Sequence, residues 1–184
     1  MSASKSDKPR EEKAVFVTVG TTRFDELVQA ATSEVAIRWM VSEGYTSLTV
    51  QYGTGGAPKV DSLSKYPISV QTYSFLPSLE LDMRQADLIL SHAGAGTVME
   101  ALRLEKKLVV VINTRLMNNH QTELAEAMAH RQHLFMVENP QELDDKSSWQ
   151  RFAKFQPVSH QVGDTSDFSR LLDTHLGFEE LKTE

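Results

Sequence analysis

Short apolar runs of strand length recur along this chain and alternate with stretches whose apolar residues repeat every three or four positions. The first run, Ala14 to Val19, is almost continuously apolar and ends at Gly20, which is typical of a strand buried on both faces. Strands that alternate with helices favour right-handed βαβ units and a mostly parallel sheet covered on both sides. The pattern predicts a Rossmann-like α/β fold with strands at 14–19, 47–52, 68–73, 87–91, 107–112 and 134–137.

The helical stretches differ in length. A long helix is expected from about Asp25 to Trp39, with shorter ones around residues 98–102 and 124–128. The segment 144–161 is the least regular part, although it contains the apolar residues Trp149 and Phe152. A last helix over 164–184 packs on its own domain or docks a partner. We therefore expect a disordered leader at 1–13, one domain at 14–163 and a C-terminal helix at 164–184.

The composition limits the possible functions. The 184 residues suit one domain with a real core, and the absence of cysteine excludes disulfides, thiolate metal sites and cysteine nucleophiles. A net charge of −6 gives no general attraction for nucleic acid or an anionic membrane surface. No run approaches the ~20 apolar residues that span a bilayer. We expect a cytoplasmic protein that reaches a membrane only through another protein.

The strongest site signal is the glycine-rich turn from Ser91 to Thr97, which joins a predicted strand to a predicted helix. Its small residues let a ligand approach the main chain, and the free N–H groups of the first helical turn favour negative charge. Glu100 lies one turn further along the same face, where a carboxylate would repel phosphate but accept both hydroxyls of a ribose. The turn predicts a site for the diphosphate of a nucleotide.

The same turn is also compatible with a tight strand-to-helix connection that binds nothing. It lacks the third glycine of the dinucleotide fingerprint and the Gly-Lys-Ser/Thr of a Walker A loop. An NAD-dependent oxidoreductase is disfavoured, because the acidic residue Glu100 lies on the helix after the turn and not about twenty residues beyond it.

Three other segments could face the same crevice, since ligands of an open parallel sheet collect at the carboxyl ends of its strands. Val19 to Thr22 is a second strand-to-turn junction, or only a helix start at which Thr22 or Asp25 serves as a cap. Tyr52 to Gly56 is a third glycine cluster, or a flexible loop. Asn113 to Gln121 carries amides and an imidazole that could bind sugar hydroxyls, or is a polar loop with a capping asparagine.

The histidines are weaker signals. His130 and His133 lie three residues apart without a third ligand at a recognisable spacing, so no metal site is expected. His92 could contact phosphate or assist chemistry, or its imidazole could only order the turn. The chain also lacks the Asp-x-Asp motif of manganese-dependent glycosyl transfer. We expect no metal and no cofactor.

Three segments considered together resemble one family: Phe16 to Asp25, Ala86 to Thr97, and Val109 to Gln121. From about Ala14 to Phe135 the chain resembles the soluble subunit of the two-part eukaryotic N-acetylglucosaminyltransferase that adds the second sugar to the dolichol-linked oligosaccharide. That family is similar to the donor-binding, C-terminal half of the bacterial enzyme that glycosylates the lipid precursor of peptidoglycan. The resemblance implies one Rossmann-like half of the two-domain GT-B architecture, with the other half on a separate membrane-anchored subunit.

The resemblance also implies roles at the matching positions. The diphosphate would lie at 94–97, the ribose hydroxyls at Glu100 and the sugar hydroxyls at 118–121. Residues 20–22 would face the pyrophosphate and the acceptor side, and main-chain groups at 75–76 would contact the uracil. The expected substrate-binding residues are Gly20, Thr21, Thr22, Phe75, Leu76, His92, Gly94, Ala95, Gly96, Thr97, Glu100, Asn118, Asn119 and Gln121, and the local catalytic candidates are His120 and His92.

The implied reaction moves N-acetylglucosamine from UDP-N-acetylglucosamine to the 4-hydroxyl of N-acetylglucosaminyl-diphosphodolichol, with inversion and without a metal. The helix N-terminus would stabilise the leaving UDP. The general base would come from the membrane-anchored partner, which would recruit the chain to the cytosolic face of the endoplasmic reticulum, and the chain alone should be inactive. The rival interpretation is a nucleotide-sugar-binding regulatory module without transfer activity.

Overall fold

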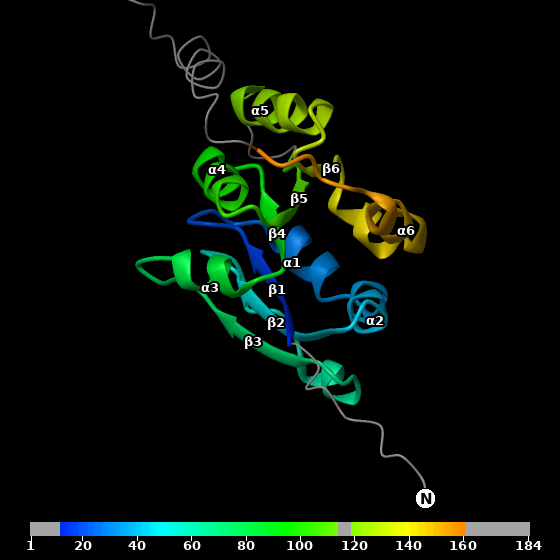
Figure 1. The fold of residues 1–184 in the computed structure, drawn as a ribbon. Coiled ribbons are helices and arrows are strands. Elements are labelled where there is room, and N and C mark those ends of the chain that lie inside the picture. Colours follow the sequence, from blue (N-terminus) through cyan, green and yellow to red (C-terminus); the bar gives the residue numbers. More distant parts are fainter. Residues whose placement is uncertain (1–11, 114–118, 161–184) are drawn as a thin grey trace, which may run out of the picture.

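A computed structural model describes residues 12–113 and 119–160. Its centre is a six-stranded parallel sheet with the order β3-β2-β1-β4-β5-β6 (Figure 1). The predicted strands are all present, with small shifts at their ends. They are β1 (Lys13–Thr18), β2 (Tyr45–Gln51), β3 (Ser69–Tyr73), β4 (Leu88–His92), β5 (Lys107–Val111) and β6 (Phe135–Val137). The strand order changes direction between β1 and β4, where sheets of this kind bind ligands at the carboxyl ends of the strands.

Helices cover both faces of the sheet (Figure 1). Alternate residues of β1 face two separate cores. Val15 and Val17 pack with the helices at 25–31, 34–42 and 146–154, whereas Phe16 packs with the helices at 80–85, 95–103 and 119–130. This two-sided burial explains why β1, β4 and β5 are almost continuously apolar. The helices are α1 (Asp25–Ala31), α2 (Glu34–Ser42), α3 (Glu80–Gln85), α4 (Ala95–Arg103), α5 (Asn119–His130) and α6 (Lys146–Lys154), with 3-10 helices η1 (Asp61–Lys65) and η2 (Pro140–Asp144).

The long helix expected from Asp25 to Trp39 is wrong, because the chain forms α1 and α2 with a break at residues 32–33. The Thr32 hydroxyl donates to the carbonyl of Val28 at 2.8 Å. Ser33 has extended backbone angles, and its hydroxyl accepts the Ala36 N–H at 3.3 Å, so it caps a new helix. The apolar period continues across the break and conceals it in the sequence.

The expectation of an irregular segment at 144–161 is wrong for its first half, which forms α6. Asp145 caps this helix by accepting the Ser147 N–H at 2.9 Å. Trp149 is 1% exposed and stacks on Trp39 of α2, with ring centroids 4.3 Å apart. Its indole N–H donates to the Leu143 carbonyl at 2.7 Å. One buried aromatic face is therefore enough to hold an otherwise polar helix on the sheet.

Both predicted ends of the chain lie outside the described residues: the leader up to residue 11, and the C-terminal helix at 164–184 with its packing or docking role. Lys13, which we assigned to the leader, opens β1. Within the part of the chain that the structure describes, no helix combines the length and the apolarity needed to cross a bilayer.

Candidate nucleotide-binding site

An open cavity of about 410 Å³ lies at the carboxyl edge of the sheet, where the loops after β1, β3 and β4 meet. It brings together predicted site residues from three separate parts of the chain. The loop after β1 and the loop after β4 contain glycines, whereas the loop after β3 is largely apolar. The lining residues are Gly20, Thr21, Gln51, Phe75, Leu76, Pro77, Ser78, Leu79, His92, Gly94, Ala95, Gly96 and Thr97.

The N-terminus of α4 forms one wall of this cavity. Gly94 is the N-cap residue, and its carbonyl accepts the Val98 N–H at 3.0 Å. The N–H groups of Ala95, Gly96 and Thr97 precede the first intrahelical donor and have no partner within the helix. No side chain among the described residues caps this end. The wall therefore offers main-chain donors and the positive end of the helix dipole to an anion.

The imidazole of His92 lies between the two glycine-containing turns. A Cβ on Gly20 would be 2.9 Å from His92 Cε1, and Gly20 has a φ of 61°, so both space and backbone conformation require glycine there. Burial lowers the pKa of His92, and a backbone contact with Thr18 opposes this only in part. Nδ1 is buried without a hydrogen bond of normal geometry to the described residues. The ring is therefore neutral at pH 7 and adds no positive charge to the anion site.

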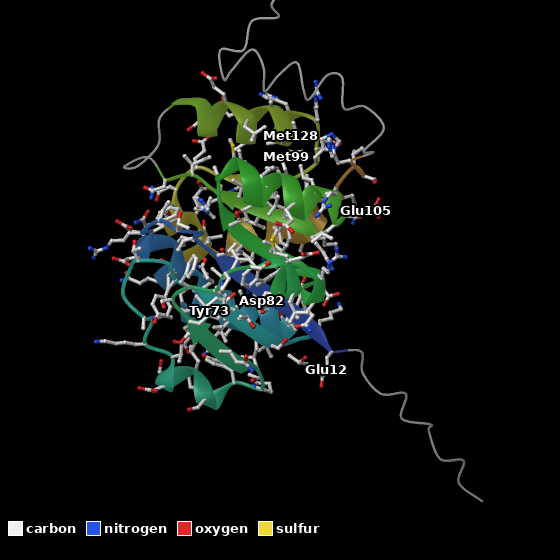
Figure 2. The ribbon with its side chains drawn as sticks, turned by 90° about the vertical axis from the view of Figure 1, so that its left-hand side faces the viewer. Glu12, Tyr73, Asp82, Met99, Glu105 and Met128 are labelled. Carbon is white, nitrogen blue, oxygen red and sulfur yellow. The ribbon has the colours of Figure 1, made fainter. Side chains whose placement is uncertain are left out.

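The loop between β3 and α3 forms the opposite, apolar wall. At its base the Tyr73 hydroxyl donates to Asp82 of α3 at 2.5 Å, and Figure 2 shows these two side chains together. Burial and this aspartate raise the pKa of Tyr73, so the phenol stays a donor at neutral pH. Phe75 and Leu76 are 61% and 42% exposed at the rim. An apolar rim of this kind suits the flat face of a nucleobase.

Two expected site residues do not line the cavity. Glu100 is half-buried on α4, one turn beyond Thr97, and its carboxylate lies 3.8 Å from the Arg103 guanidinium. The Thr22 hydroxyl donates to the Val19 carbonyl at 2.8 Å. The structure therefore brings together the main-chain part of the predicted site and places Glu100 beside it on the same helix.

The interpretation of Thr22 or Asp25 as a helix cap is wrong. The N-cap residue of α1 is Phe24, and no side-chain hydrogen bond caps that helix. Asp25 accepts from Arg23 Nε at 2.7 Å and from the Gly56 N–H at 3.1 Å. The arginine hydrogen bond is the main reason that the pKa of Asp25 is lowered.

The third glycine cluster, 52–56, supports the site from outside the cavity lining. Gly53 has a φ of 62°, and a Cβ there would lie 2.1 Å from the Thr22 carbonyl oxygen. The Gly53 N–H donates to the Ser74 carbonyl at 3.0 Å, and the Thr54 N–H donates to the Thr22 carbonyl at 3.1 Å. The cluster therefore ties the loops after β1 and β3 to each other.

The side chains of the predicted sugar-binding cluster at 118–121 lie outside what the structure describes. Asn118 lies outside the described residues. Asn119, His120 and Gln121 open α5, but their side chains are also outside what the structure describes. Their roles stay predictions. Among the described residues no group of three His, Asp or Glu side chains is placed to hold a metal ion.

Sequence reasoning missed Gln51 and the lining residues 77–79. Gln51 ends β2, is 1% exposed, and hydrogen-bonds to both loops on either side of it. A weak signal for it exists in the sequence, because Gln51 stands at the end of a predicted strand just before the glycine-rich segment 53–56. Residues 77–79 carry no comparable signal, since only the path of the loop brings them to the cavity.

Comparison with known proteins supports a family assignment. The model for the glycosyltransferase family 28 C-terminal domain matches residues 14–170. The UDP-N-acetylglucosamine transferase subunit ALG13 of Mus musculus is 46% identical over 124 residues, which are 67% of this chain but only 10% of the mouse protein. The ALG13 subunit of Saccharomyces cerevisiae is 30% identical over 147 residues, covering 63% of this chain and 73% of the yeast protein.

Solved structures agree on the fold. The NMR solution structure of ALG13 superimposes with a TM-score of 0.61 at 25% identity, covering 88% of this chain and 96% of that one. The crystal structure of Acinetobacter baumannii MurG superimposes with a TM-score of 0.53 at 15% identity, covering 93% of this chain and 51% of the MurG chain. The expected Rossmann-like half of a GT-B architecture is thus confirmed. The chain belongs to the family of the glycosyltransferase family 28 C-terminal domain, within the group of the ALG13 transferase subunits.

Proposed function

We propose that this chain binds UDP-N-acetylglucosamine and is the donor half of a transferase that passes the sugar to N-acetylglucosaminyl-diphosphodolichol. A membrane-anchored subunit would supply the acceptor half and hold the chain at the cytosolic face of the endoplasmic reticulum. The observation that carries the proposal is the cavity with an uncapped helix N-terminus on one wall and an apolar loop on the other. The name of the ALG13 relatives, subunits of a UDP-N-acetylglucosamine transferase, supports this donor and a partner subunit.

The two walls suit the two ends of a nucleoside diphosphate. The diphosphate would accept from the N–H groups at 95–97 and lie opposite Gly20, and the uracil would lie against Phe75 and Leu76. Glu100, one helical turn from Thr97, would accept the ribose hydroxyls. The sugar would extend toward the start of α5, where Asn119 and Gln121 would bind its hydroxyls.

In the proposed reaction the 4-hydroxyl oxygen of the acceptor attacks the anomeric carbon from the face opposite the diphosphate. The bond between that carbon and the diphosphate oxygen breaks, UDP leaves with the electron pair, and the configuration inverts. The N–H groups and dipole at the start of α4 stabilise the charge that develops on the leaving oxygen, in place of a metal.

The acceptor proton must pass to a general base. The neutral ring of His92 can accept a proton, but it lies behind the glycine turns among the diphosphate-binding groups. We therefore assign the base to the partner subunit and keep His92 and His120 as local candidates. It follows that the chain without its partner binds the donor but does not transfer the sugar.

Isothermal titration without added metal tests donor binding, with UDP-N-acetylglucosamine, UDP-glucose, ADP and NAD as ligands. Selective binding of the UDP-sugar is expected. Glu100→Ala should lower the affinity for UDP by about tenfold. It should also remove any preference of the protein for UDP over 2′-deoxy-UDP. Glu126→Ala on the exposed side of α5 is the matched control and should leave both unchanged. A Glu100→Ala protein that still discriminates the 2′-hydroxyl would refute the ribose assignment.

A radiolabelled transfer assay separates the enzyme from a binding module. Transfer to the dolichol-linked acceptor is expected only when the membrane subunit is added, and Asn119→Ala or Gln121→Ala should abolish donor use while the fold survives. Donor binding that never leads to transfer with the partner present would favour the regulatory module. Transfer by the chain alone would contradict the assignment of the base to the partner.

A further inference from the structure

The side-chain amide of Gln51 joins the loops on both sides of the cavity. Its Nε2 donates to the carbonyls of Gly20 and Ser74, each at 2.7 Å. Its Oε1 accepts from the Thr18 hydroxyl at 2.6 Å and from the Val19 N–H at 3.2 Å. These partners lie in β1 and the loop after it, and in the loop after β3. The one side chain therefore connects segments that are distant in the sequence.

The amide has no capacity left for a ligand. A glutamine side chain offers two N–H donors and an oxygen with two lone pairs, and all four are occupied by protein groups. Gln51 is also 1% exposed, although it contributes to the cavity wall. Any influence of Gln51 on a ligand must therefore act through the main chain that it holds.

That main chain belongs to the two walls that would receive opposite ends of a nucleotide. Gly20 is fixed at both its polar groups, because its N–H donates to the Thr18 hydroxyl at 3.1 Å and its carbonyl accepts from Gln51. Ser74 directly precedes Phe75 and Leu76, and the far side of this loop is fixed by the bond from Tyr73 to Asp82 (Figure 2). Together with the main-chain hydrogen bonds of Gly53 and Thr54, the amide thus sets the separation between the glycine turn after β1 and the apolar loop after β3.

We propose that Gln51 is a positioning residue that sets the spacing between the diphosphate-binding turn and the base-binding loop, so that the site recognises the base and the diphosphate as one ligand. The inference rests on the proposed function. The base and the diphosphate are covalently linked, so their separation is limited, and a site that already matches it loses less entropy on binding. Without the amide, the two loops keep their indirect link through the main chain of Gly53 and Thr54 but lose the direct link between Gly20 and Ser74.

Gln51→Leu tests this role, with Gln71→Leu on the exposed face of β3 as the matched control. In the folded variant, hydrogen exchange should accelerate in both 19–22 and 74–79, and affinity for UDP-N-acetylglucosamine should fall by about tenfold or more. The control should change neither. Unchanged exchange in either loop, or unchanged affinity, would overturn the role of Gln51. Failure of the wild-type chain to bind any UDP ligand would instead overturn the proposed function, and with it the ligand assigned here.

Gln51→Glu tests the positioning role of Gln51 if the leucine variant does not fold. It keeps the side-chain shape but turns the Nε2 donor into an oxygen that faces the two carbonyls of Gly20 and Ser74. Affinity relative to wild type should therefore be low at pH 8 and should recover in part at pH 6, where the introduced carboxyl can take a proton and donate again. UDP-N-acetylglucosamine is the probe because its diphosphate does not titrate in this range. A ratio independent of pH would contradict the positioning role.

Discussion

Gly94 faces the imidazole of His92 so closely that a Cβ on Gly94 would lie 2.3 Å from His92 Nε2. Gly94→Ala therefore forces the ring or the turn to move. Overpacking of this kind lowers the free energy of unfolding by roughly 1–3 kcal/mol. The displaced turn should also lower the affinity for UDP-N-acetylglucosamine by at least about tenfold. Urea unfolding and isothermal titration measure the two effects.

The double variant Gly94→Ala/His92→Ala is the control for this cause. Removing the ring removes the clash, so the double variant should regain part of the stability that Gly94→Ala alone loses. Strictly additive losses would show that the imidazole is not the group displaced.

Gly96→Ala separates a ligand site from a bare turn. Apart from its chain neighbours and its own helix backbone, no atom of the described residues lies within 4 Å of a Cβ on Gly96, and alanine in the first turn of α4 should preserve or raise stability by up to about 1 kcal/mol. The new methyl group would nevertheless stand in the cavity wall. We expect weaker binding of UDP-N-acetylglucosamine by a protein of equal or higher melting temperature. If the affinity for UDP-N-acetylglucosamine does not change, the diphosphate does not bind at the first turn of α4.

His92 should make stability depend on pH. Its pKa in the folded chain lies below the usual 6.5, so the unfolded chain binds a proton that the folded chain resists. The free energy of unfolding should therefore fall as the pH drops through 6.5 toward the folded-state pKa of His92. Above that pH range the contribution of His92 should not change with pH. Urea titrations of wild type and His92→Gln between pH 7.5 and 5.5 test this. If the free energy of unfolding has the same slope against pH in both proteins, the prediction is refuted. His160→Gln is the control for the other histidine whose pKa is lowered.

Trp149→Ala should damage the fold and spare the site. The residue is fully buried, stacks on Trp39 and donates to the Leu143 carbonyl, so its loss should cost roughly 3–5 kcal/mol of unfolding free energy. Since α6 packs on the face of the sheet with α1 and α2, the donor affinity of the folded fraction should not change. Lys154→Ala, exposed on the same helix, should leave stability within about 0.5 kcal/mol.

The parallel sheet was predictable because burial on both faces leaves a trace in the sequence: Leu88, Ile89 and Leu90 are consecutive and all fully buried. The turn after β4 was predictable for a similar reason, since small residues between a strand and a helix allow a tight connection, although α4 begins at Ala95 and not at Thr97. Both signals are local, and the structure confirms the strand and the turn that they indicated.

Other features depend on contacts that no short segment reveals. The break between α1 and α2 arises from hydrogen bonds of Thr32 and Ser33 beneath an uninterrupted apolar period. The α6 helix depends on Trp39, more than a hundred residues earlier in the chain. The role of Gln51 depends on partners in two other loops, so the sequence shows a polar residue at a strand end but not what it holds.

The position of β4 between β1 and β5 has a consequence for biosynthesis. The described residues that line the cavity all lie at or before Thr97, but β5 follows at 107–111, so until β5 emerges from the ribosome β4 is an edge strand. That edge begins with Leu88, Ile89 and Leu90, and unpaired apolar edges promote aggregation during synthesis. A pause in synthesis after β4 has emerged from the ribosome, and before β5 has done so, would therefore leave this apolar edge exposed.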